Sequence, residues 1–217
     1  MKKGILFDLD GTLWHSAHVV TASWNRALRT LPDFKLQISG EDMMRFMGNL
    51  LHDIGRMMLP RNLSDTRVDE MIERCIVYEH ETLRAHGAPL FPGTEDALRR
   101  LQDEYALYIV SNCQAGYIEI FLEYYGFDRY FADFLCPGMT GCSKAENIRR
   151  IVARHGLTNA VYVGDTNGDA LAAASAGISF IHAAYGYGRP ERAGLAVKGL
   201  SELPALLSAL GDAVFLV

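Results

Sequence analysis

The chain has 217 residues, of which 49% are hydrophobic, so it contains enough apolar material for a substantial core. Its formal net charge is -5 and its lysines and arginines are scattered, which argues against a surface that binds nucleic acid. The four cysteines include no C-x-x-C pair, so we expect neither a zinc site nor a disulfide framework. No apolar run is long enough for a signal-peptide core or a membrane span, and we therefore expect a cytoplasmic protein without a membrane partner.

The first predicted element is a short apolar strand over residues 5–7, which is followed by Asp8, Asp10 and Thr12. A strand that runs into an Asp-Gly turn is common in globular proteins and by itself predicts no site. In an open α/β sheet, however, active sites lie at the carboxyl ends of the strands. The segment is therefore compatible with an ordinary turn and with a catalytic one.

Residues 15–87 have the hydrophobic spacing of helices throughout. Pro32 ends the first predicted helix, a capping box of Ser39 and Asp42 begins the second, and Ser64 is the expected N-cap of the third. The second helix carries a methionine-rich stripe that we expect to be packed in a core. The three helices cover about residues 15–31, 39–58 and 64–87.

From residue 88 onward, strands and helices alternate, which is typical of parallel βαβ units. The predicted strands cover residues 107–110, 131–135, 160–163 and 178–182, and the predicted helices cover residues 94–104, 117–125, 144–155 and 170–176. We therefore expect an α/β fold with a doubly wound parallel sheet formed by residues 1–14 and 88–217. An α-helical cap domain, residues 15–87, is inserted after the first strand, with hinges near His15 and residues 87–89.

Polar residues also stand near the ends of later strands. Ser111 and Asn112 follow the strand at 107–110, and Asp165 and Asp169 follow the strand at 160–163. Lys144 begins a predicted helix. Taken singly, these residues have ordinary interpretations as a turn, a surface lysine and a helix-capping acid. Because parallel strands end at one edge of the sheet, we expect all of them to converge there with the residues after the first strand.

The converging groups are the ones that phosphoryl transfer needs, namely an oxygen nucleophile, a proton carrier and positive charge. The carboxylates of Asp8, Asp10, Asp165 and Asp169 would repel one another in a cleft unless a cation offset them, and hard oxygen ligands favour Mg²⁺. Lys144 supplies a point charge for a phosphate. Hydrogen bonds to that phosphate would come from Ser111, Asn112 and backbone N–H groups after Asp8.

Four motifs follow one another in the chain, and as a set they are far more specific than any member. They read Asp8-Leu9-Asp10-Gly11-Thr12, Ser111-Asn112, Lys144 and Gly164-Asp165-x-x-x-Asp169. Over nearly its whole length the chain resembles the haloacid dehalogenase-like hydrolases. The resemblance is strongest to the phosphoglycolate-phosphatase-like branch, which carries a helical cap after the first strand.

The resemblance implies a role for each motif residue. Asp8 would be the nucleophile that forms an aspartyl-phosphate, and Asp10 would protonate the leaving oxygen and later take a proton from water. Asp165 would complete a Mg²⁺ site with Asp8 and the Asp10 backbone carbonyl. Asp169 would bind the ion through a water molecule or hold the residues that bind it. Thr12 would orient Asp10. Thr12, Ser111, Asn112 and Lys144 would bind the phosphate.

Within the family, the acid at Asp10 favours a phosphatase, because displacing a halide needs no proton on the leaving group. We expect hydrolysis of a small phosphorylated metabolite. A phosphomutase and a non-catalytic binding protein with the same fold remain alternatives. A phosphonoacetaldehyde hydrolase, which needs a cap lysine, would depend on Lys35, the lysine found within residues 15–87.

The cap is expected to set specificity by closing over the leaving group. Its candidate contact residues are Arg45, Asn49, His52 and Arg56, although each is also compatible with a solvated face. His15 stands where many relatives have an acid. We expect Cys113 to be a small packed residue and the glycine-rich residues 185–188 to form a cleft wall.

Overall fold

Six parallel strands form the central sheet of the protein in the computed structural model, which describes residues 2–31, 36–191 and 194–215. The strand order is β3-β2-β1-β4-β5-β6, and every neighbouring pair is parallel. The strands are β1 (Lys3–Phe7), β2 (Ala106–Val110), β3 (Phe131–Leu135), β4 (Asn159–Gly164), β5 (Ser179–Ala183) and β6 (Leu195–Val197). The prediction of a doubly wound parallel sheet is confirmed.

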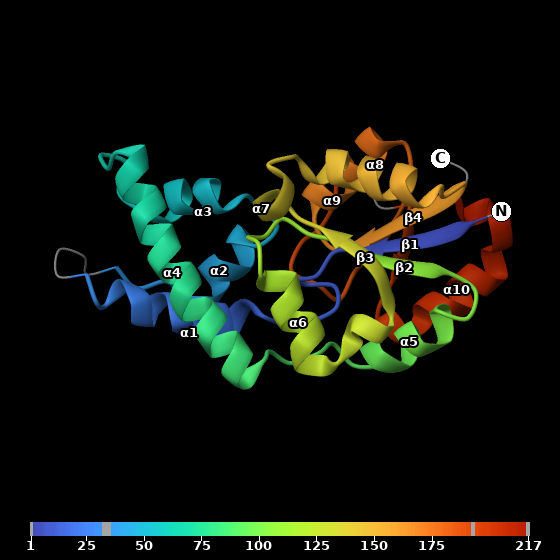
Figure 1. Cartoon of the computed structure of the whole chain (residues 1–217), viewed down its shortest axis with the longest axis horizontal. Coiled ribbons are helices and arrows are strands. Elements are labelled where there is room, and N and C mark those ends of the chain that lie inside the picture. The colour runs from blue at the N-terminus through green and yellow to red at the C-terminus, as the bar shows by residue number, and fades with distance from the viewer. Residues whose placement is uncertain (1, 32–35, 192–193, 216–217) are drawn as a thin grey trace.

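Helices cover both faces of this sheet, as Figure 1 shows. Side chains alternate along β1, so Ile5 and Phe7 belong to one buried cluster and Leu6 to another. The first cluster includes residues of α5 (Thr94–Leu101), α6 (Tyr117–Tyr125) and α10 (Leu203–Leu210), and the second includes residues of α8 (Lys144–His155) and α9 (Asn167–Ala176). Burial on both faces explains why the strands read as continuous apolar runs.

The strand order reverses between β1 and β4, which are paired in register from Lys3 with Asn159 to Phe7 with Val163. Beyond the last pair, the N–H of Asp8 still donates to the carbonyl of Val163 at 2.8 Å. In open α/β sheets, ligands bind at the carboxyl ends of the strands at such a reversal of the strand order. This geometry places the residues after β1 beside those after β4.

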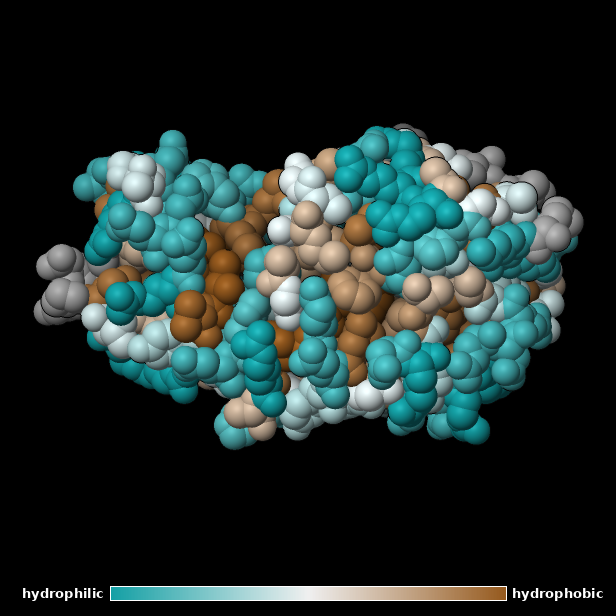
Figure 2. All heavy atoms as spheres, in the orientation of Figure 1, coloured by the Kyte–Doolittle hydropathy of each residue, from teal (hydrophilic) through white to brown (hydrophobic). Residues whose placement is uncertain are grey.

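Four helices between β1 and α5 have a hydrophobic cluster of their own. They are α1 (Ala17–Leu28), α2 (Gly40–Phe46), α3 (Leu51–Met58) and α4 (Asp65–His86). The chain enters and leaves them side by side, since the N–H of His15 donates to the carbonyl of Pro89 at 2.7 Å. Figure 2 shows hydrophobic side chains along the boundary between these helices and the rest of the molecule.

The prediction of one helix over residues 39–58 is wrong, because the segment forms α2 and α3 with a break between them. The capping box of Ser39 and Asp42 begins α2 as expected. The break contains Gly48, whose φ of +84° lies in the left-handed region that interrupts a right-handed helix. Pro32 and Lys35, which the sequence analysis singled out, lie outside the described residues.

Two α-helices and one strand were not predicted, namely α7 (Pro137–Thr140), α10 and β6, and neither were the short 3-10 helices. Helix α7 and strand β6 are short, with four and three residues, and such segments carry little periodicity. Among the residues that the structure describes, no helix combines the length and the apolar character needed to cross a bilayer.

Candidate active site

Lys144 lies between two buried carboxylates at the carboxyl edge of the sheet. Its Nζ atom is 2.8 Å from Oδ1 of Asp8 and 2.5 Å from Oδ1 of Asp169. Asp8 directly follows β1, Lys144 is the first residue of α8, and Asp169 lies in the first turn of α9. Burial disfavours the ammonium, but the charges of Asp169 and Asp8 outweigh it and hold the pKa of Lys144 well above its usual value. Lys144 is therefore a permanent cation beside Asp8.

Asp165 adds a third buried carboxylate to this group. Its Oδ2 accepts the N–H groups of Tyr187 and Gly188, at 2.6 and 3.1 Å, whereas its Oδ1 is buried without a hydrogen-bond partner among the described residues. Burial and the neighbouring charges of Asp169 and Asp8 raise the pKa of Asp165 well above its usual value. A free, buried carboxylate oxygen is costly unless something binds it.

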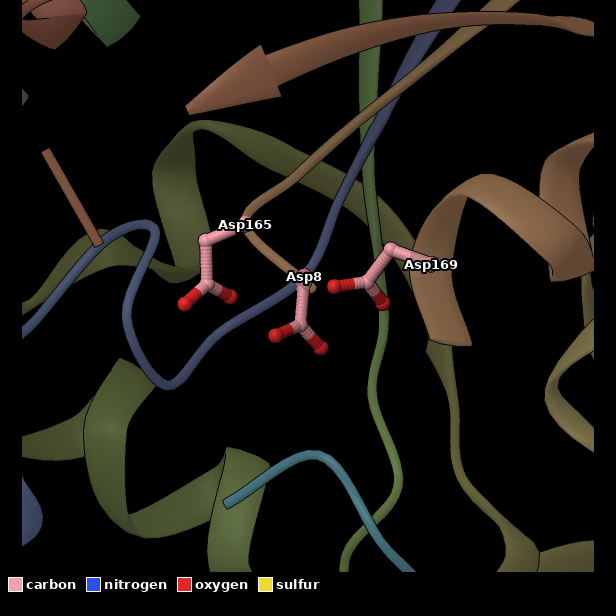
Figure 3. Close-up of side chains that lie close together, drawn as sticks. All are labelled: Asp8, Asp165 and Asp169. Atoms are coloured by element: carbon pink, nitrogen blue, oxygen red, sulfur yellow. The ribbon is translucent and has the colours of Figure 1, made fainter. Parts of the chain in front are cut away.

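The three carboxylates fit a divalent cation. Asp8, Asp165 and Asp169 each offer one oxygen, and these oxygens lie within 4.8 Å of one another. Figure 3 shows the three side chains close together, reaching one space from separate segments of the chain. One ammonium cannot neutralise three carboxylates, and an all-oxygen donor set suits Mg²⁺. The unpartnered Oδ1 of Asp165 is an open ligand position for such an ion.

Asp169 differs from the other two carboxylates because both of its oxygens are already hydrogen-bonded. Oδ1 accepts from Lys144, and Oδ2 accepts the N–H and the hydroxyl of Thr166 at 2.9 and 2.7 Å, which caps α9. Its observed contacts hold Lys144 and the start of α9. This arrangement is compatible with the expectation that Asp169 reaches a metal through water rather than directly.

The carboxylate of Asp10 is not part of this triad and accepts hydrogen bonds from three donors. Its Oδ1 accepts the indole N–H of Trp14 at 2.8 Å, the hydroxyl of Tyr117 at 2.8 Å and the hydroxyl of Ser16. Burial raises the pKa of Asp10, and the three hydrogen bonds oppose the rise. The hydroxyl of Thr12 has no hydrogen-bond partner among the described residues, so it does not contact Asp10 here, and the role of Thr12 in orienting Asp10 stays a prediction.

The predicted phosphate-binding residues after β2 lie at the same edge. Ser111 is buried and its N–H donates to the carbonyl of Leu135 at 3.3 Å. The amide of Asn112 donates to the carbonyl of Gly48 at 2.9 Å, so it contacts the break between α2 and α3. Its Oδ1 is buried without a partner among the described residues. Phosphate binding by these two side chains stays a prediction.

A small cavity lies between the sheet edge and helices α1 to α4, and we call it the cap cavity. Its core side is lined by Asp10, Asn112, Cys113, Gln114 and Tyr117. The opposite side is formed mainly by apolar residues of the cap helices, with one acid, Glu79 of α4. Asp10 therefore lines a small, mostly apolar space at this edge of the sheet.

A family model described as haloacid dehalogenase-like hydrolase matches residues 5–183 of the chain. The chain belongs to the haloacid dehalogenase-like hydrolases. The resemblance inferred from the four motifs is thereby confirmed, and the fold agrees with it.

Relatives and solved structures support membership of this family. A phosphoglycolate phosphatase of Haemophilus influenzae (strain 86-028NP) is 27% identical over 198 residues, covering 85% of this chain and 87% of the relative. A pyrophosphatase, PpaX, of Oceanobacillus iheyensis is 29% identical over 134 residues, covering 60% of this chain and 58% of the relative. The crystal structure of a predicted phosphoglycolate phosphatase from Haemophilus somnus has a TM-score of 0.83 at 23% identity, covering 94% and 97% of the two chains.

Three of the four cap residues that the sequence analysis named as candidate contacts lie in ion pairs with neighbouring acids. Arg45 pairs with Glu41, His52 with Asp69 and Arg56 with Asp65, in every case with exposed side chains on at least one partner. The fourth, Asn49, lines the cap cavity. Cys113 is buried there, and burial raises the pKa of its thiol well above the usual value, in agreement with a packed residue.

Sequence reasoning missed several residues that complete this site in a haloacid dehalogenase-like hydrolase. Residues 185–188, predicted as a cleft wall, in fact hold Asp165 through two N–H groups. No sequence pattern pointed to Tyr117, because it lies more than a hundred positions from Asp10. A pattern did point to Glu79, since it lies four residues from both Cys75 and Leu83 on the buried face of α4, where an acid is unusual.

Proposed function

We propose that the protein is a Mg²⁺-dependent phosphatase that hydrolyses the phosphomonoester of a small metabolite. The observation that carries this proposal is the buried ammonium of Lys144 on Asp8, with Asp10 held separately two residues later. A carboxylate beside a fixed cation, as in Asp8, can attack a phosphorus atom. A carboxyl group that faces the cap cavity, as in Asp10, can donate a proton to the leaving oxygen. The relatives named as phosphoglycolate phosphatase and pyrophosphatase support hydrolysis of bonds to phosphorus.

In the proposed reaction, an oxygen of Asp8 attacks phosphorus and the bond from phosphorus to the alcohol oxygen breaks. Asp10 gives its proton to that oxygen, and burial, which raises the pKa of Asp10, favours the protonated form required. Asp10 then takes a proton from water, which attacks the aspartyl-phosphate and releases inorganic phosphate. Lys144 offsets the charge of the phosphoryl oxygens throughout.

A Mg²⁺ ion bound by Asp8 and Asp165 would offset the negative charge that the carboxylates and the phosphoryl group bring together. The remaining predicted phosphate contacts, Thr12, Ser111 and Asn112, would donate hydrogen bonds from their side chains. The unpartnered hydroxyl of Thr12 and the buried position of Ser111 are compatible with this role.

We also propose the division into a core of residues 1–14 and 88–217 and a cap of residues 15–87. Its support is the separate hydrophobic cluster of α1 to α4 and the paired crossing at His15 and Pro89. Such a cap would exclude water from the reaction while the leaving group is held.

Removing magnesium tests the proposed function. We expect the protein to release inorganic phosphate from p-nitrophenyl phosphate with Mg²⁺ present and to lose that activity, by about a hundredfold or more, after treatment with a chelator. Restoring Mg²⁺ should recover the rate. Phosphate release that is unchanged by chelation would contradict the metal dependence. In a parallel incubation with a sugar phosphate, isomerised sugar phosphate without free phosphate would indicate a mutase instead.

Tyr117→Phe removes one of the donors that hold Asp10 while keeping the ring packed. We expect kcat for p-nitrophenyl phosphate to fall about tenfold, because a hydrogen bond to a charged group is worth about 1.5–3 kcal/mol. Tyr124→Phe, on the exposed face of the same helix, is the matched control and should leave kcat unchanged. A loss of thermal stability at constant kcat would show that the Tyr117 hydroxyl is merely structural.

A further inference from the structure

Glu79 is a buried acid that faces the cap cavity, and the proposed reaction does not use it. Its side chain is 3% exposed on α4. Oε1 accepts the side-chain amide of Gln114 at 2.6 Å, and Oε2 accepts the indole N–H of Trp24. Since Trp24 belongs to α1 and Gln114 follows β2, two separate parts of the chain hold this carboxylate in place.

Among the described residues, the side-chain partners of Glu79 are neutral. None of the residues that line the cap cavity in the described part of the chain is Lys, Arg or His. His80, the next residue of α4, contacts the Gln114 amide at 3.1 Å and does not line the cavity. Burial lowers the pKa of His80, so at neutral pH its imidazole adds no positive charge.

Asp10 and Glu79 therefore line one small, mostly apolar space. Burial raises the pKa of Glu79 to about 7, the hydrogen bonds from Gln114 and Trp24 oppose the rise, and the charge of Asp10 adds to it. The carboxylate of Glu79 would repel a second anion brought into this space, whereas a ligand N–H or O–H group can donate a further hydrogen bond to it. The other walls include Met43 and Met47, which offer apolar contact.

We propose that Glu79 selects phosphomonoesters whose alcohol carries a hydrogen-bond donor, a hydroxyl or an ammonium group, and no second anion. This inference rests on the proposed phosphatase function, because it places the terminal polar group of the leaving alcohol in this small cavity beside Asp10. It separates this protein from the substrate in the names of its relatives, since the alcohol released from phosphoglycolate carries a carboxylate. A carboxylate in the cap cavity would meet two acids and no lining cation.

Three esters that differ only in one terminal group test the inference: phosphoethanolamine, 2-hydroxyethyl phosphate and phosphoglycolate. With the unmodified protein and Mg²⁺, we expect kcat/KM for the first two to exceed that for phosphoglycolate by about tenfold or more. Equal values for the three esters, or a preference for phosphoglycolate, would overturn the inference. This comparison needs no variant, so it does not depend on how a substitution affects folding.

Glu79→Gln then assigns the selection to this residue. We expect the ratio of kcat/KM between phosphoethanolamine and phosphoglycolate to fall by about tenfold, because the side chain keeps its size and loses its charge. Glu81→Gln, on the exposed side of α4, is the matched control and should leave the ratio unchanged. An unchanged ratio in Glu79→Gln would overturn the role of Glu79.

Hydrolysis of p-nitrophenyl phosphate, measured in parallel, separates the two proposals. If that ester is cleaved while phosphoglycolate is the preferred metabolite, the selectivity is wrong and the phosphatase function stands. If no ester releases phosphate with Mg²⁺ present, the proposed function is wrong and the selectivity falls with it.

Discussion

Asp8→Asn should reduce phosphate release from p-nitrophenyl phosphate by about three orders of magnitude or more, because it removes the proposed nucleophile. The amide has nearly the same shape as the carboxylate, and its carbonyl oxygen can still accept the hydrogen bond from Lys144 that the structure shows at 2.8 Å. We therefore expect the variant to fold. Circular dichroism and thermal unfolding would check that the protein is intact before its rate is compared.

The matched control for this experiment is Asp128→Asn, an exposed aspartate far from the sheet edge that ends β1. It changes the net charge by the same amount and should leave kcat within about twofold of the original value. Incubation with substrate and rapid acid quenching should trap phosphate on the original protein and none on Asp8→Asn. Full activity in Asp8→Asn would refute the proposed nucleophile.

Lys144→Met should both abolish activity and destabilise the fold. The substitution leaves Asp8, Asp165 and Asp169 facing one another without the ammonium that now contacts two of them. Removing one partner from a buried ionic group costs about 3–5 kcal/mol, so the free energy of unfolding should fall by that amount in urea denaturation without magnesium. The exposed Lys198→Met is the control, with an expected change within about 0.5 kcal/mol.

Magnesium provides a second readout for Lys144→Met. A ligand that binds the folded state alone stabilises it, and the need for a cation is greater when the ammonium is gone. We expect Mg²⁺ to raise the unfolding temperature of Lys144→Met more than that of the original protein. A variant as stable as the original, with the same response to Mg²⁺, would show that Lys144 does not neutralise the triad.

Local signals in the chain were enough for most of the architecture. The apolar run before Asp8 predicted β1, Ser64 and Gly87 marked the ends of α4, and the alternation after residue 88 predicted the parallel sheet. These features depend on neighbours within a few residues, through capping, turn geometry and hydrophobic period. The convergence of the four motifs then followed from the rule that parallel strands end at one edge.

The break at Gly48 could not be predicted from helical spacing, because methionines on both sides of it continue the same apolar stripe. It depends on the left-handed conformation of one glycine and on the amide of Asn112, which binds the Gly48 carbonyl from the end of β2. The donors to Asp10 are likewise distant in sequence, apart from Trp14 and Ser16. Packing between distant segments, and not the order of residues in the sequence, decides which side chains reach an active-site atom.

The sequence by itself determined the family and the sheet. It also predicted Asp8, Asp10, Lys144 and Asp165 as the reacting groups, because each lies near a strand or helix end with a recognisable local pattern. Only the tertiary structure decided which side chains line the cap cavity, where we propose that part of the leaving alcohol lies. Glu79 is one acid among many in the chain until α4 packs against α1 and the segment after β2. Burial then makes an unbalanced negative charge costly. A buried carboxylate can therefore distinguish an alcohol that carries a hydrogen-bond donor from one that carries a second anion.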